Sequence, residues 1–132
     1  MTKRREVTPT DGELAILAVL WKTGPATVRQ VNEVLNRERR TGYTTTLKLM
    51  QIMTRKGLLD RNDSERTHVY KAAFAAADTE RHMVSELLEK VFGGSAKALV
   101  MSALTAKKVP PDELARVRKL LDEIEGEHKD ER

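Results

Sequence analysis

Residues 43–57, YTTTLKLMQIMTRKG, decide the fold of this chain. Side chains that suit a protein core recur there at helical spacing, at Thr46, Leu49, Met50 and Met53. Gly57 follows at the position where a left-handed helix C-cap is expected. The stretch therefore predicts a helix over residues 43–56 with one face in the core. Its opposite face would present Thr44, Thr45, Lys48, Gln51 and Arg55 to solvent.

Two short strand-like segments, 58–61 and 67–71, follow this helix and flank the polar turn 62–65. Such a pair predicts a β-hairpin. Two helices should precede it, because Thr10 with Glu13 and Thr27 with Gln30 each form the sequence pattern of a capping box. Three helices and then a hairpin is the order of a winged helix, which we expect over residues 7–72.

The first two helices show apolar faces of their own. In the first, which Gly24 and Pro25 should end, the face expected in the core is formed by Leu14, Leu17, Ala18 and Trp21, widened by Ile16, Val19 and Leu20. In the second, which should fade near Glu38, the inward residues are Val28, Val31, Val34 and Leu35.

Three further helices are predicted after residue 77. Asp78 or Thr79 should cap one that runs to Phe92, and Gly93 with Gly94 should break it. Ser95 should cap the next, to about residue 106. The last should begin after residues 110–111, two prolines, and leave 126–132 as a frayed charged tail.

These helices carry apolar stripes too narrow to form a core by themselves. We therefore expect residues 78–125 to form a helical dimerisation domain in which a second copy covers the stripes. An alternative is that the last helix packs on its own domain. The expected dimerisation residues are Leu87, Leu88, Val91, Leu99, Leu114, Val117, Leu121 and Ile124.

Composition narrows the classes of protein. The 132 residues include no cysteine, which excludes disulfides and thiolate metal sites, and no apolar run approaches the length of a membrane span. With no signal-peptide pattern behind residues 1–6, we expect a cytoplasmic protein without membrane insertion.

The charges are distributed unevenly along the chain. Residues 1–72 hold 14 Lys and Arg against 8 Asp and Glu, whereas residues 73–132 hold 10 against 12. A basic module before a slightly acidic one suits a DNA-facing domain joined to an assembly domain.

The outward face of the 43–56 helix suits contact with duplex DNA. Tyr43 can lie on the sugar-phosphate backbone, and Thr44 and Thr45 can approach phosphates or base edges, although helix capping would also explain both threonines. Lys48 and Gln51 have groups that match guanine and adenine edges, and Arg55 is better placed to contact phosphate.

The hairpin offers a second set of contacts. Arg66 and His68, with Arg61 and Lys71 nearby, would let the wing touch a neighbouring groove or backbone, the alternative being a solvated charged face. Ile52 should lie at the boundary of the outward face.

The sequence shows few features that are typical of an enzyme. The histidines are scattered, and only His82, near Asp78 and Glu86, forms a helical group that could bind a metal; an ordinary salt-bridge cluster is the favoured interpretation. There is no glycine-rich phosphate loop and no nucleophile elbow. We expect no cofactor, no metal site and no enzymatic activity.

Several stretches together resemble the penicillinase repressor family, of the BlaI, MecI and CopY type. The stretches lie at 14–17, 20–21, 26–31, 42–47 and 55–59, and in the C-terminal part at 91–95, 98–100, 112–114 and 120–122. The resemblance spans about Val7 to Ile124. It implies a homodimer that represses transcription from a palindromic operator of the TACA/TGTA kind.

In the best-known members of that family the controlled genes encode a β-lactamase or resistance transpeptidase and a membrane sensor protease, whose activation leads to repressor cleavage. Ser102-Ala103 stands where some members have the cleaved Asn-Phe bond, which puts the same induction in doubt here. The absence of cysteine excludes a thiolate copper switch. Ala72 or Ala73 replaces the usual proline after the last wing strand.

The sequence therefore predicts a sequence-specific DNA-binding transcriptional repressor that acts as a homodimer on double-stranded operator DNA, with a membrane sensor protease as a further partner implied by the resemblance. Two alternatives stay open. One is a winged helix that serves as a protein-interaction adaptor, and the other is a metal-dependent enzyme that uses His82.

Overall fold

The computed structural model describes residues 7–130, and their side chains as far as residue 127. The chain forms two compact units that divide between Glu86 and Leu87. This division does not test which segments fold by themselves. The domain limits expected from the sequence, 7–72 and 78–125, therefore stay predictions.

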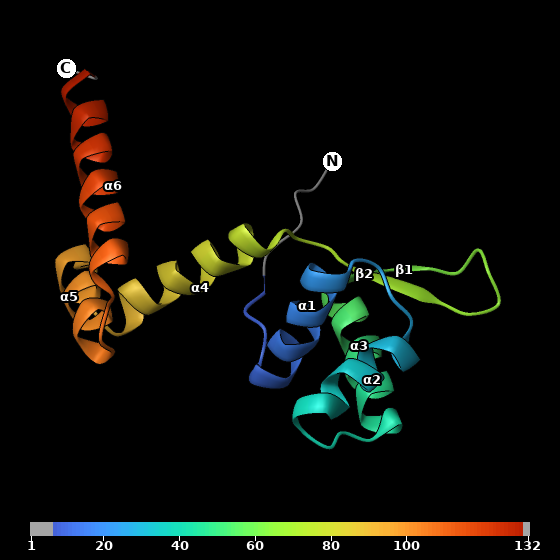
Figure 1. The fold of residues 1–132 in the computed structure, drawn as a ribbon. Helices are drawn as coiled ribbons and strands as arrows, with labels where there is room; N and C mark the ends of the chain where they lie inside the picture. The colour runs from blue at the N-terminus through green and yellow to red at the C-terminus, as the bar shows by residue number, and fades with distance from the viewer. Residues whose placement is uncertain (1–6, 131–132) are drawn as a thin grey trace. The chain divides into compact units, whose positions relative to one another are not determined.

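The first unit is a winged helix, as predicted. It contains α1 (Asp11–Thr23), α2 (Val28–Glu38) and α3 (Tyr43–Lys56), then the strands β1 (Leu59–Asn62) and β2 (Val69–Ala72), and the larger part of α4 (Ala76–Lys90) (Figure 1). The bounds of α3 are those predicted.

Local sequence explains where the first three helices begin and end. Thr10 and Glu13 form a complete capping box at α1, and Thr27 and Gln30 form another at α2. Gly57 ends α3 in the left-handed region, with φ 85° and ψ 12°, where a side chain would be strained.

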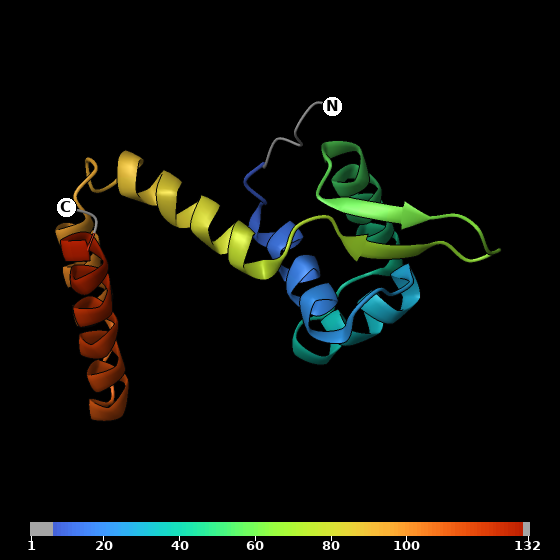
Figure 2. The same ribbon diagram turned by 90° about the horizontal axis from the view of Figure 1, so that it is seen from above.

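The hairpin is antiparallel, with Leu59 opposite Ala72 and Asn62 opposite Val69. Its turn projects away from the helices of this unit in both views (Figure 1, Figure 2). The first strand starts one residue later than predicted because the Leu58 N–H closes the end of α3 on the Met53 carbonyl, at 2.9 Å. The segment between α1 and α2 also pairs with the hairpin, through Ala26 and Tyr70.

The core of the first unit lies between the three helices and the base of the hairpin. Its most deeply buried apolar side chains are Ile16, Leu17, Val31, Met50, Met53, Leu59 and Tyr70. Burial of these side chains is the main favourable contribution to folding.

The buried face of α1 differs from the predicted one. Ala18 is exposed and Leu14 and Trp21 are only half-buried, whereas Ile16 and Leu20 are buried. The reason is that α1 packs against α2, α3 and β2 together, which turns the helix about its axis relative to the face that apolar spacing alone favoured. Ala18 lines an open groove beside α2 instead.

The remaining helices are α4, α5 (Ala96–Ala106) and α6 (Pro111–Asp130). Gly93 and Gly94, with φ of 56° and 83°, separate α4 from α5, and the Ser95 side chain caps α5. The prediction for α4 was wrong at both ends, since the helix begins at Ala76 and ends at Lys90. Alanines at 75–77 favour helix and extend α4 past the polar caps predicted at residues 78 and 79.

The predicted frayed tail was wrong as well, because α6 continues through Gly126 to Asp130. A glycine inside a helix costs only about 1 kcal/mol, and the charged residues around it favour helix. Of the helices that the structure describes, none is long and apolar enough to cross a membrane.

Candidate nucleic-acid interface

One face of α3 is exposed along its whole length. Thr44, Lys48, Gln51 and Arg55 are four or three residues apart and all exposed, so they form one stripe, which we call the α3 stripe. The opposite face holds Thr46, Met50 and Met53, each 0% exposed. The core therefore fixes which side of α3 reaches solvent.

Two more predicted residues lie beside this stripe at the start of α3. Tyr43 is 49% exposed and Thr45 is exposed. Ile52, at 36% exposed, lies at the boundary of the face as expected. The structure thus exposes all six predicted α3 residues, although Tyr43 and Thr45 line two different grooves. Their contacts with DNA stay a prediction.

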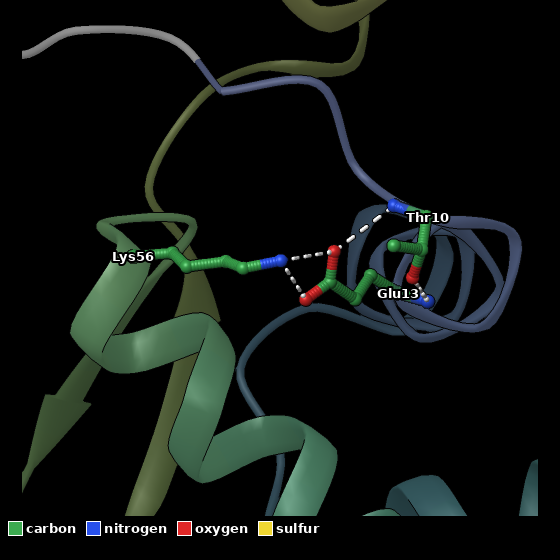
Figure 3. Close-up of polar contacts among 3 residues, drawn as sticks. All are labelled: Thr10, Glu13 and Lys56. Carbon is green, nitrogen blue, oxygen red and sulfur yellow. Dashed lines mark hydrogen bonds and ion pairs between the residues drawn. The ribbon is translucent and has the colours of Figure 1, made fainter.

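The far end of α3 is held to α1 by a part-buried ion pair, in which the carboxylate is buried and the lysine still reaches solvent. Lys56 Nζ lies 2.9 Å from Glu13 Oε2 and 3.1 Å from Oε1, and the Thr10 backbone N–H donates to the same carboxylate (Figure 3). Burial raises the pKa of Glu13, but the Thr10 and Lys56 contacts outweigh it, so the pKa lies below its ordinary value of 4.5. Glu13 therefore stays charged at neutral pH and pairs with the Lys56 ammonium group.

The wing carries the other two predicted residues. Arg66 and His68 are both exposed and lie in the segment between β1 and β2. Arg61, by contrast, is bound within the hairpin, since its Nε and one terminal nitrogen lie 2.7 and 3.1 Å from the two carboxylate oxygens of Asp63. This bidentate contact with Asp63 raises the pKa of Arg61.

An open groove of about 550 Å³ connects the wing to the starts of α2 and α3. It brings together Tyr43, Arg66 and His68, as well as Arg29 and Thr67, which the sequence analysis had not proposed as contacts. Arg29 could have been found, because it lies in the capped first turn of α2 and helix N-termini favour phosphate. Cationic side chains around an open groove suit a nucleic-acid backbone.

His82, Asp78 and Glu86, which were considered as metal ligands, do not form a three-ligand metal site in the structure. His82 Nε2 lies 3.1 Å from Thr8 Oγ1 and 3.4 Å from Glu86 Oε1, while Asp78 binds Arg81 at 2.7 Å. Among the described residues, no three His, Asp or Glu side chains are placed to hold a metal ion together.

The winged helix, the exposed basic stripe of α3 and the cationic groove define a DNA-binding protein of the winged helix-turn-helix class. Comparison with known proteins identifies the family within this class. The family described as "Penicillinase repressor" matches residues 9–123. The chain therefore belongs to the penicillinase repressor family.

Curated relatives agree with this membership. The transcriptional regulator BlaI of Mycobacterium tuberculosis, in strains CDC 1551 / Oshkosh and ATCC 25618 / H37Rv, is 32% identical over 120 residues, which cover 89% of this chain and 86% of the relative.

Among solved structures, the hsRosR-S4 complex has a TM-score of 0.54 at 15% identity and covers 89% of this chain and 90% of that one. That likeness concerns the fold alone. Family and fold together make this chain a DNA-binding transcriptional repressor and not an enzyme.

Proposed function

We propose that two copies of this chain bind a palindromic operator, each placing α3 in the major groove. The observation that carries the proposal is the α3 stripe, which is exposed over about three turns on a helix whose other side is the core. In the proposed complex Lys48 and Gln51 contact base edges. Thr44 and Thr45 hold the start of the helix close to the groove floor.

The groove beside the wing would hold the sugar-phosphate backbone. Arg66 and His68 approach it from the wing, Tyr43 from α3, and Arg29 from the capped start of α2. Arg55, at the other end of the α3 stripe, contacts a further phosphate. These contacts set affinity and register, whereas sequence is distinguished by the base-edge contacts.

In this proposal the second unit forms the dimer interface. Among described residues 87–127 no side chain is buried, although the segment is rich in large apolar residues. Leu120, Leu121 and Ile124 of α6 are 53%, 54% and 42% exposed, and Leu87 and Val91 are 45% and 64% exposed. Leu88, Leu99, Leu114 and Val117 are half-buried. A second copy would cover these stripes and bring two α3 helices about ten base pairs, or a small multiple of ten, apart.

The description of the family as a penicillinase repressor supports genes of β-lactam resistance as targets. Control of cell-envelope stress genes and a cytoplasmic location are further parts of the proposal. Release by a membrane sensor protease belongs to the same proposal. Cleavage between Ser102 and Ala103 would require local unfolding, because both residues lie within α5 and proteases cleave extended chains.

Footprinting on the DNA upstream of the chain's own gene, followed by a salt titration on the protected duplex, tests the proposal. We expect a symmetric footprint and an affinity that falls steeply with salt. An adaptor without DNA specificity would give no footprint and equal, weak binding to a scrambled duplex of the same length.

A further inference from the structure

The turn between α2 and α3 is held by a small polar network centred on a buried asparagine. Asn32 of α2 is 9% exposed, and its Nδ2 donates to the Thr41 carbonyl and to Thr46 Oγ1, both at 2.9 Å. One amide group thus ties α2 to the turn and to the first half of α3.

A second asparagine completes the network one helical turn further along α2. Asn36 Nδ2 donates to Asn32 Oδ1 at 3.1 Å, and Asn36 Oδ1 accepts from the Thr41 backbone N–H at 2.6 Å. Both backbone groups of Thr41 are therefore bound to side chains of α2. Asn36 itself is exposed and lies outside the core.

This turn leads directly into the part of α3 that carries the proposed contacts. The N-cap of α3 is Gly42, which has no side chain to fix the first turn of the helix, unlike the threonine caps of α1 and α2. Thr41 precedes that cap, and Tyr43 and Thr44 follow it. The network therefore fixes the entry to α3 where a capping side chain is missing.

We propose that Asn36, acting through Asn32 and Thr41, is a positioning residue for DNA recognition: it holds the start of α3 in the orientation that base-edge contact needs. The inference rests on the proposed function of the α3 stripe. Base-edge hydrogen bonds depend on orientation more than phosphate contacts do, so loss of the network reduces specificity more than general affinity.

The test compares the dissociation constants of Asn36→Ala and the unaltered protein for the footprinted operator and for a scrambled duplex. We expect the ratio of specific to non-specific affinity to fall about tenfold, the size of effect that loss of one base contact gives. The thermal midpoint should change little, because Asn36 is exposed and water can replace its bond to Thr41.

Two further variants separate positioning from stability. Asn36→Asp keeps the acceptor for the Thr41 N–H but loses the donor to Asn32 Oδ1. Its added negative charge weakens binding to both duplexes alike, so the ratio should return part of the way toward that of the unaltered protein. Ile16→Val loosens the core while it leaves the network intact, and should lower the thermal midpoint without changing the ratio. Amide exchange at Thr41 should quicken in Asn36→Ala and not in Asn36→Asp.

An Asn36→Ala ratio equal to that of Ile16→Val would overturn the inference. Lys48→Ala, measured in parallel, shows which proposal has failed. If Lys48→Ala lowers the ratio and Asn36→Ala does not, only the positioning role is wrong. If neither variant lowers it, the α3 stripe does not distinguish sequence and both proposals fall.

Discussion

Glu13, in the first turn of α1, and Lys56, the last residue of α3, form an ion pair with a shortest N–O distance of 2.9 Å. The residues are 43 positions apart. The carboxylate side chain is 2% exposed and the lysine side chain 37%, so the pair joins a buried anion to a cation that still reaches solvent (Figure 3). It fixes the C-terminal end of the proposed recognition helix to the domain.

Glu13→Gln should destabilise the fold in a pH-dependent manner. The pKa of Glu13 is lower in the folded chain than its ordinary value of 4.5, which we take for the unfolded chain. Its contribution is therefore fully present above about pH 4.5 and is lost as the pH falls through the folded pKa. We expect the variant to lose about 1–3 kcal/mol at pH 7, and less at pH 3.5, in urea unfolding.

Glu33→Gln is the matched control, because Glu33 is an exposed carboxylate on α2. It should change the free energy of unfolding by less than about 0.5 kcal/mol at either pH. A Glu13→Gln loss that is the same at pH 7 and pH 3.5 would contradict a lowered pKa.

Gly57→Ala should destabilise through the backbone alone. A Cβ built on Gly57 meets no atom within 4 Å, but its φ of 85° lies in the left-handed region. The expected loss is about 1–2 kcal/mol in the free energy of unfolding. Gly12→Ala is the comparison, since Gly12 is inside α1 and a Cβ there makes ordinary contact with Leu49 Cδ1 at 3.6 Å. That change should stabilise by up to about 1 kcal/mol, and two equal losses would be inconsistent with the left-handed cap.

Features that depend on neighbours in the sequence were predictable. The capping boxes at Thr10 and Thr27, the glycine cap at Gly57 and the exposed stripe of α3 all follow from spacings of three or four residues. Local patterns of this kind reflect backbone hydrogen bonding within one helix, which the sequence specifies directly.

Features that depend on tertiary contacts were not predictable from one sequence. Glu13 was identified as a capping residue, but its burial against Lys56 requires α1 and α3 to meet. The Asn32 network joins positions 9 and 14 residues apart, which no helical periodicity connects. The exposure of Ala18 likewise depends on which three elements surround α1.

Leu121→Gln should dissociate the proposed dimer. Leu121 is 54% exposed in the single chain and lies in the apolar stripe of α6. Fully burying a leucine is worth about 1.5–3 kcal/mol, and about half of that is left to gain for a side chain that its own chain already covers by half. The dimer would lose two such contributions, about 1.5–3 kcal/mol in total, so the dissociation constant should rise about 10- to 10²-fold in sedimentation equilibrium. Glu123→Gln introduces the same side chain outside the stripe and should leave the dimer intact. Equal association of both variants would exclude this stripe as the interface.

Lys48→Ala should weaken operator binding by about 1–3 kcal/mol, with a smaller effect on a scrambled duplex. The reason is that Lys48 lies at the middle of the α3 stripe, where a base edge would be closest. Fluorescence anisotropy with both duplexes measures the difference. Lys97→Ala removes the same charge from an exposed position on α5 and should change neither affinity beyond experimental error. Unchanged operator affinity in Lys48→Ala would remove this residue from the interface.

Arg66→Ala should behave differently from Lys48→Ala, because the wing groove is proposed to hold phosphate and not bases. Operator and scrambled duplex should lose affinity by a similar factor, and the slope of log affinity against log salt should shrink by about 1, the value for one lost phosphate contact. Arg118→Ala, at an exposed position on α6, removes an equal charge outside the first unit and should leave the slope unchanged. A selective loss of operator binding in Arg66→Ala would instead place this arginine against base edges. An unchanged slope would mean that the wing stays clear of the backbone.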